Sequence, residues 1–211
     1  MRSLILISTL ALGLAASTTP ADARGVRLFV HQEVTDYAAW RQDYDSFDAT
    51  RRKLGVTAQA VYQSADNPND VTVTHDFRTA EKAKAFAASA ELTAAMQKAG
   101  VKGAPQVWVT MATAGGSGRP SHVRMFVRHE VADYAAWRKG YDEFRAHHRI
   151  GVTGQAVYQA ADNPNDVTVT HDFRSLEQAK AMAMSADLKA AMQKAGVKGT
   201  PQIWFASRAA K

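Results

Sequence analysis

The stretch "VTVTHDFR" occupies residues 71–78 and recurs without a change at residues 167–174. Around it, residues 26–108 match residues 123–204 almost throughout. A repeat of about one hundred residues has the length of a domain, whereas solenoid units are much shorter. The sequence therefore predicts two copies of one small domain, residues 24–111 and 122–211, joined by a Gly/Ser/Pro-rich linker at 112–121.

Each copy shows the signals of a β-α-β-β-α-β unit. In the first copy, strand patterns at 26–32, 56–63 and 71–77 surround a helix that begins after Asp36 and ends at Gly55. The segment 65–70, "ADNPND", predicts a hairpin turn. A second helix begins after Thr79, is interrupted near Ser89 and precedes a last strand at 106–110.

This element order predicts the α+β class and a ferredoxin-like repeat. Helices on one face of a four-stranded antiparallel sheet leave the other face bare, and a second copy can cover it. We therefore expect two ferredoxin-like βαββαβ repeats that pair as an intrachain, pseudo-dimeric α/β barrel with the helices outside.

Three motifs carry a resemblance to a known family. They are "DYAAWR" at 36–41, "DNPNDVTVTHDF" at 66–77 and "AMQKAGVKGAPQVW" at 95–108. With their counterparts in the second copy, they resemble the antibiotic-biosynthesis-monooxygenase-like members of the dimeric α/β-barrel superfamily. The resemblance covers nearly all of both copies and implies the barrel fold and an oxygenase or cyclase activity without a cofactor. Haem ligation through His75 is an alternative that rests on the superfamily alone.

The first residues of the chain read as an export signal. Met1 and Arg2 precede an apolar run at 4–16, and "ADA" at 21–23 has the small residues of a cleavage site. We expect a signal peptide at 1–23 and a periplasmic or secreted protein that does not contact the membrane after cleavage. The chain has no cysteine, so thiol catalysis and disulfides are excluded. Its net charge of +6 is scattered, which argues against nucleic-acid binding.

His75 and His171 are the candidate catalytic residues. The strand period of two places each imidazole on the valine face of its strand, where burial would keep it neutral and able to accept a proton. The plainer alternative is a core histidine bonded to a neighbour. The aspartate that follows each histidine points to the opposite face, so the dipeptide cannot form a histidine–carboxylate dyad.

An aromatic stripe on the first helix of each copy is the candidate ligand-binding surface. Rings spaced by three and four residues usually form core, but phenols among them suit a pocket for an aromatic ligand. The helix residues are Tyr37, Trp40, Tyr44, Tyr134, Trp137 and Tyr141. We expect strand aromatics to close the same pockets from the sheet side, namely Tyr62, Trp108, Tyr158 and Trp204.

The copies differ at a few positions that bear on the sites. His31 aligns with Arg128, Gln32 with His129, and the pair 51–52 with the histidines at 147–148, so the two sites need not be equivalent. Adjacent helical histidines point about 100° apart and do not converge on one ion. His31 and His75 on neighbouring strands are a slightly better pair, but we predict no metal and no cofactor.

Two functions compete on these grounds. The first is an exported, monooxygenase- or cyclase-like enzyme that binds a small aromatic or polyketide-like compound and oxidises it without a cofactor. The alternative is a non-catalytic periplasmic binding protein of the same fold. A filled cavity would instead indicate a protein that acts through its surface.

Overall fold

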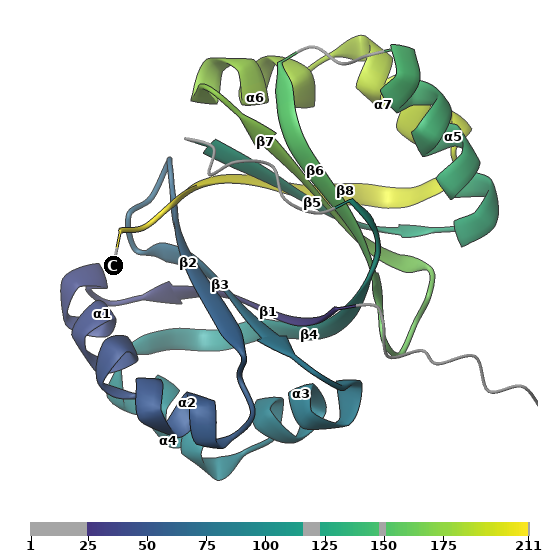
Figure 1. The fold of residues 1–211 in the computed structure, drawn as a ribbon. Helices are drawn as coiled ribbons and strands as arrows, with labels where there is room; N and C mark the ends of the chain where they lie inside the picture. Colours follow the sequence, from purple (N-terminus) through teal and green to yellow (C-terminus); the bar gives the residue numbers. More distant parts are fainter. Residues whose placement is uncertain (1–24, 116–122, 148–150, 211) are drawn as a thin grey trace, which may run out of the picture.

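A computed structural model describes residues 25–115, 123–147 and 151–210 of the chain (Figure 1). The first copy comprises β1 (Val26–Val34), α1 (Tyr37–Ser46), α2 (Asp48–Lys53), β2 (Ala58–Ser64), β3 (Asp70–Phe77), α3 (Ala80–Ala87), α4 (Ala90–Lys98) and β4 (Val101–Gly115). The second copy comprises β5 (Val123–Val131), α5 (Tyr134–His147), β6 (Val152–Ala160), β7 (Asp166–Phe173), α6 (Leu176–Ala183), α7 (Ala186–Lys194) and β8 (Val197–Arg208).

Local sequence signals account for the ends of the helices. Asp36 accepts a hydrogen bond from the Ala39 amide at the start of α1, and Ser89 caps α4 where the second helix was expected to break. Gly55 ends α2 with φ at +101°, a left-handed conformation that glycine adopts without strain. The first helix is divided at Phe47, whereas its counterpart α5 runs unbroken.

The eight strands close into one antiparallel barrel in the order β1-β3-β2-β8-β5-β7-β6-β4. Each copy supplies four adjacent strands, and the helices of both copies lie outside the ring (Figure 1). This arrangement confirms the predicted fold class, two ferredoxin-like repeats paired as an intrachain barrel. Closure joins each half-sheet to the other at both of its edges, through the β4–β6 and β2–β8 pairs.

The two seams of the barrel are built from the long last strands. The end of β4 pairs with β6, from Thr110 opposite Ala160 to Gly115 opposite Ala156. The end of β8 pairs with β2, where Arg208 lies opposite Tyr62. The predicted last strand is therefore too short, because β4 runs from Val101 to Gly115. The predicted linker is wrong for residues 112–115. These residues have the composition of a loop, but their backbone groups pair with the other copy at the seam.

Alternate residues of each strand face two different cores. Outward-facing residues pack under the helices of their own copy. Inward-facing residues form one shared aromatic core, which contains Phe29, Tyr62, Trp108, Phe126, Tyr158 and Trp204. Within it, Phe29 stacks on Trp108 and Phe126 stacks on Trp204, each with ring centroids 5.2 Å apart.

Two buried hydrogen bonds tie the copies together inside the barrel. The indole nitrogen of Trp108 donates to the Thr168 hydroxyl at 3.0 Å, and that of Trp204 donates to the Thr72 hydroxyl at 2.8 Å. Each bond therefore joins a last strand to the central hairpin of the other copy. Because both partners are buried, loss of the hydroxyl would leave an indole N–H without an acceptor.

The predicted signal peptide at 1–23 lies outside the described residues. Among the residues that the structure describes, no helix is long and apolar enough to cross a membrane.

We expect Thr72→Val to lower the free energy of unfolding by about 1–3 kcal/mol, because the Trp204 N–H loses its acceptor in a dry core. Denaturant unfolding followed by circular dichroism measures the change. Both copies should still unfold in one transition, since they share the aromatic core. Thr93→Val, on the exposed surface of α4, is the matched control and should change stability by less than about 0.5 kcal/mol. Two separate transitions in the unmodified protein would contradict the shared core.

Candidate functional site

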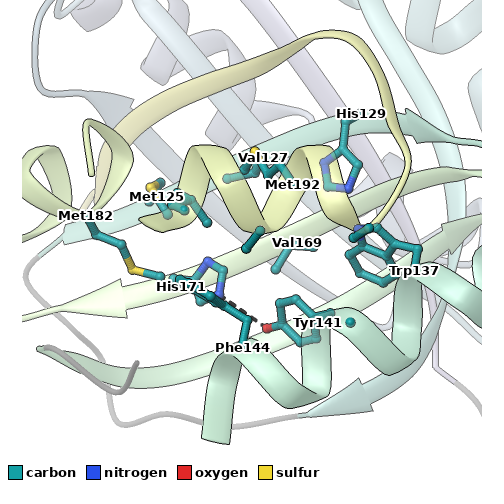
Figure 2. Close-up of a pocket in the computed structure, with 14 residues that line it drawn as sticks. Met125, Val127, His129, Trp137, Tyr141, Phe144, Val169, His171, Met182 and Met192 are labelled. Carbon is teal, nitrogen blue, oxygen red and sulfur yellow. Dashed lines mark hydrogen bonds between the residues drawn. The ribbon is translucent and has the colours of Figure 1, made fainter. Parts of the chain in front are cut away.

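An apolar pocket lies between the helices and the sheet of the second copy (Figure 2). Trp137 and Tyr141 of α5 form one wall, and Met182 and Met192 of α6 and α7 form another. The floor includes His171 of β7. The cavity holds about 40 Å³, which is room for a few waters but less than the roughly 150 Å³ of a cavity that binds benzene.

The phenol of Tyr141 and the imidazole of His171 meet in this pocket, as the dashed line in Figure 2 shows. Tyr141 Oη lies 3.2 Å from His171 Nε2. The pair forms because α5 lays one side on the outer face of β7, and Trp137 stacks on Tyr141 with ring centroids 5.1 Å apart. The structure thus brings together the histidine and the helix aromatics that the sequence singled out.

Burial keeps the histidines of this pocket neutral. It lowers the pKa of His171 to about 4, although the neighbouring Asp172 acts in the opposite direction. The Nδ1 atom of His171 is buried and has no hydrogen-bond partner within the described part of the chain. A neutral imidazole with one unsatisfied nitrogen can accept or donate one further hydrogen bond, depending on its tautomer.

His129 is a second buried imidazole on the wall of the same pocket, beside Trp137 (Figure 2). Neither of its ring nitrogens has a hydrogen-bond partner in residues 25–115, 123–147 and 151–210, and burial lowers its pKa to about 4. The sequence shows that His129 aligns with Gln32, but His129 was not among the predicted site residues. The available signal was its position, since it is two residues from Val127 and so shares the outer face of β5.

The first copy has a matching pocket with fewer unpartnered buried atoms among the described residues, namely His75 Nδ1 and Gln32 Oε1. Tyr44 Oη lies 3.3 Å from His75 Nε2, and burial, aided by Arg51, lowers the pKa of His75 to about 3. Burial also raises the pKa of Tyr44 to about 12, so its phenol stays protonated.

Arg51 occupies part of the first pocket, which also holds about 40 Å³. Its guanidinium is 1% exposed, lies 3.8 Å from the centre of the Tyr44 ring and donates to Gln59 and to the Tyr44 carbonyl. In the sequence, residue 51 stands out only as a position that differs between the copies. Its burial results from this set of acceptors, which no local pattern reveals.

The prediction that strand aromatics close these pockets is wrong. Tyr62, Trp108, Tyr158 and Trp204 lie inside the barrel, on the other side of the sheet from the histidines. The register gives the reason, because cross-strand partners share a face. Tyr62 pairs with Thr72, which lies one position from the outward-facing Val71 and Val73 and therefore points to the opposite face of the sheet.

Some of the aromatic residues on α1 and α5 line the two pockets, and the others lie at the start of these helices. Trp40 and Tyr44 line the first pocket, and Trp137 and Tyr141 line the second. Tyr37 contacts Trp40 at the beginning of α1. The Tyr134 hydroxyl donates to Thr113 of β4 at 2.8 Å and thereby connects the two copies.

The described residues contain no cluster of three or more metal-binding side chains. The alternative pairing of His31 with His75 is wrong, because His31 points into the barrel, where it stacks on Trp204 and contacts Asp70 at 2.7 Å. A haem does not fit either helix–sheet pocket, since each holds about 40 Å³ and the Nε2 atoms of His75 and His171 are occupied by tyrosines.

Comparison with solved structures shows that the fold resembles α/β barrels, several of which are described as monooxygenase-like. No family model and no curated protein matches the chain. An anthrone oxidase-like protein superposes with a TM-score of 0.67 at 12% identity, over 90% of this chain and 93% of the other. A monooxygenase candidate from Fusobacterium nucleatum gives a TM-score of 0.60 at 6% identity, over 88% and 92%.

A haem-binding protein from Thermus thermophilus also superposes, with a TM-score of 0.54 at 11% identity, over 88% of this chain and 91% of the other. The resemblance to monooxygenase-like ferredoxin-type barrels is thus confirmed at the level of the fold. At such low identities, the different functions of these neighbours do not transfer to this chain.

We expect the protein to lose stability as the pH falls from about 6.5 to about 4. In this range the unfolded histidines take up protons and the folded ones do not, because burial lowers the pKa of His75 to about 3 and those of His129 and His171 to about 4. Each histidine contributes a slope of up to about 1.4 kcal/mol per pH unit. Denaturant unfolding at pH 5, 6 and 7 measures the slope.

His129→Gln, which installs the residue of the first copy, should remove one histidine's share of that slope. Imidazole proton shifts in NMR spectra supply the direct check. Titration of any of these three imidazoles near pH 6.5 in the folded protein would contradict their burial.

Proposed function

We propose that this protein binds a small phenolic compound in the helix–sheet pocket of its second copy, and that it does so outside the cytoplasm. The observation that carries the proposal is a pair of buried, neutral imidazoles in one apolar pocket, His129 and His171, with ring nitrogens that find no hydrogen-bond partner among the described residues. Buried polar groups normally have partners, and a ligand hydroxyl would supply one.

The second pocket is favoured over the first because its walls can move. Met125 and Met182 stand where the first copy has Leu28 and Phe86. Methionine side chains are flexible and adapt to a ligand, so a cavity of about 40 Å³ can enlarge when a ring enters. In the first pocket, the buried Arg51 is fixed by several hydrogen bonds and resists such enlargement.

Oxidation of the bound compound by dioxygen is the second candidate function. In such a reaction a ring CH₂ and O₂ give a carbonyl and water, and a neutral base must first accept a proton from carbon. The neutral imidazole of His171 beside the Tyr141 phenol supports this role, and the anthrone oxidase-like neighbour suggests the substrate class. A pKa of about 4 makes His171 a weak base, so binding is the stronger proposal.

Binding is tested by titration with phenol, monitored through the methionine methyl groups in NMR spectra. We expect the methyl signals of Met182 and Met192 to shift and that of Met184, which is 85% exposed, to stay unchanged. His171→Phe replaces the imidazole with a slightly larger aromatic ring that has no hydrogen-bonding nitrogen, and it should weaken binding at least about tenfold. The matched change His75→Phe in the first copy should leave the affinity unchanged. Equal effects of the two variants would contradict a site in the second copy.

Oxidation is tested with anthrone under oxygen in the presence of a chelator, by following the absorbance of anthraquinone. If His171 is the base, His171→Phe should lower kcat/KM at least about a hundredfold. Above about pH 5 the rate should not change with pH, because the free imidazole is already neutral there. Unchanged turnover in the variant would remove His171 from the reaction, and no turnover in the unmodified protein would leave binding as the function.

A further inference from the structure

A separate polar cavity lies inside the barrel, on the opposite side of the sheet from the helix–sheet pockets. It holds about 270 Å³, close to the roughly 300 Å³ at which small-molecule pockets begin. Both copies line it with the same residue types: an arginine, a tyrosine and an aspartate from each. They are Arg27, Tyr62, Asp76, Arg124, Tyr158 and Asp172.

These side chains form two equivalent units, each built from both copies. Arg27 makes a two-point contact with Asp76, at 2.6 and 2.9 Å, and its third nitrogen donates to the Tyr158 hydroxyl at 2.8 Å. In the related unit, Arg124 contacts Asp172 at 2.7 and 2.9 Å and donates to the Tyr62 hydroxyl at 2.7 Å. Each tyrosine is thus held in place by the arginine of the other copy.

These hydrogen bonds leave the phenol O–H groups available to donate into the cavity. They leave neither carboxylate without an arginine partner. Each phenol oxygen accepts from an arginine, so its own proton needs another acceptor, and the described residues supply none. Both oxygens of each carboxylate are engaged by their own arginine. Burial raises the pKa of Tyr158, so this phenol remains a donor.

The side chains that line the cavity carry a net positive charge. Three arginines line it against two aspartates, and the third, Arg208, is exposed and makes no ion pair or side-chain hydrogen bond among the described residues. A donor-rich cavity with one excess positive charge matches a ligand that carries oxygen acceptors and a negative charge.

We propose that the interior of the barrel is a binding site for a small oxyanion, a short dicarboxylate or a phosphate, whose oxygens accept the phenol protons of Tyr62 and Tyr158. The paired symmetry of the donors suits a ligand with two or more equivalent oxygens. The exposed guanidinium of Arg208 supplies the positive charge that offsets the negative charge of the ligand. This site shares no residue with the helix–sheet pockets, so it is independent of the phenol-binding proposal.

The test is isothermal titration calorimetry of the purified protein with succinate and with inorganic phosphate, at constant ionic strength set by sodium chloride. We expect saturable binding of one ligand per chain in at least one of these arms, and the stronger arm identifies the ligand class. Tyr62→Phe with Tyr158→Phe should weaken that binding about a hundredfold, about tenfold for each hydroxyl. Succinamide, which has no charge, should not bind.

Two further variants keep the test decisive. Tyr44→Phe with Tyr141→Phe removes the same number of hydroxyls outside the barrel and should leave oxyanion affinity unchanged. Arg208→Ala changes an exposed side chain, so it should fold normally even if the double tyrosine variant does not, and it should weaken binding several-fold. Absence of binding in both arms, or affinities that neither the Tyr62/Tyr158 nor the Arg208 change affects, would overturn the proposal.

Discussion

The structure depends on covering the inner face of each half-sheet with the inner face of the other. Aromatic rings from both copies pack against one another between the sheets, and two indole N–H groups find their only described side-chain acceptors across this interface. A single copy would expose these rings and leave both indoles without partners. Burial of such large aromatic surfaces is the main driving force available to a domain without disulfides.

The repeated strand owes its composition to this two-sided environment. His75 and Asp76 are neighbours in sequence, yet one faces an apolar pocket under the helices and the other faces the barrel cavity. The first environment favours a neutral side chain, and the second provides an arginine for a carboxylate. One dipeptide thereby supplies two sites of opposite character, and the same division holds for His171 and Asp172.

The fold was predictable because its signals are local and occur twice. The caps at Asp36 and Ser89, the hairpin turn and the period of two in the central strand each point to one arrangement. The site was predictable only on the helix side. The faces of Tyr62 and Trp108 depend on strand register, the burial of Arg51 depends on several distant acceptors, and the extension of β4 depends on a seam partner in the other copy. None of these is written in a short stretch of sequence.

Covalent fusion of the two halves has a consequence that an assembly of identical subunits cannot have. In a symmetric dimer every substitution appears twice, so a rigid pocket on one side enforces a rigid pocket on the other. Here the ion-paired guanidinium of Arg51 makes the pocket of the first half rigid. Methionine side chains make the pocket of the second half adaptable. Mutations can therefore adapt the pocket of one half to a new ligand while the other half preserves the stability of the barrel.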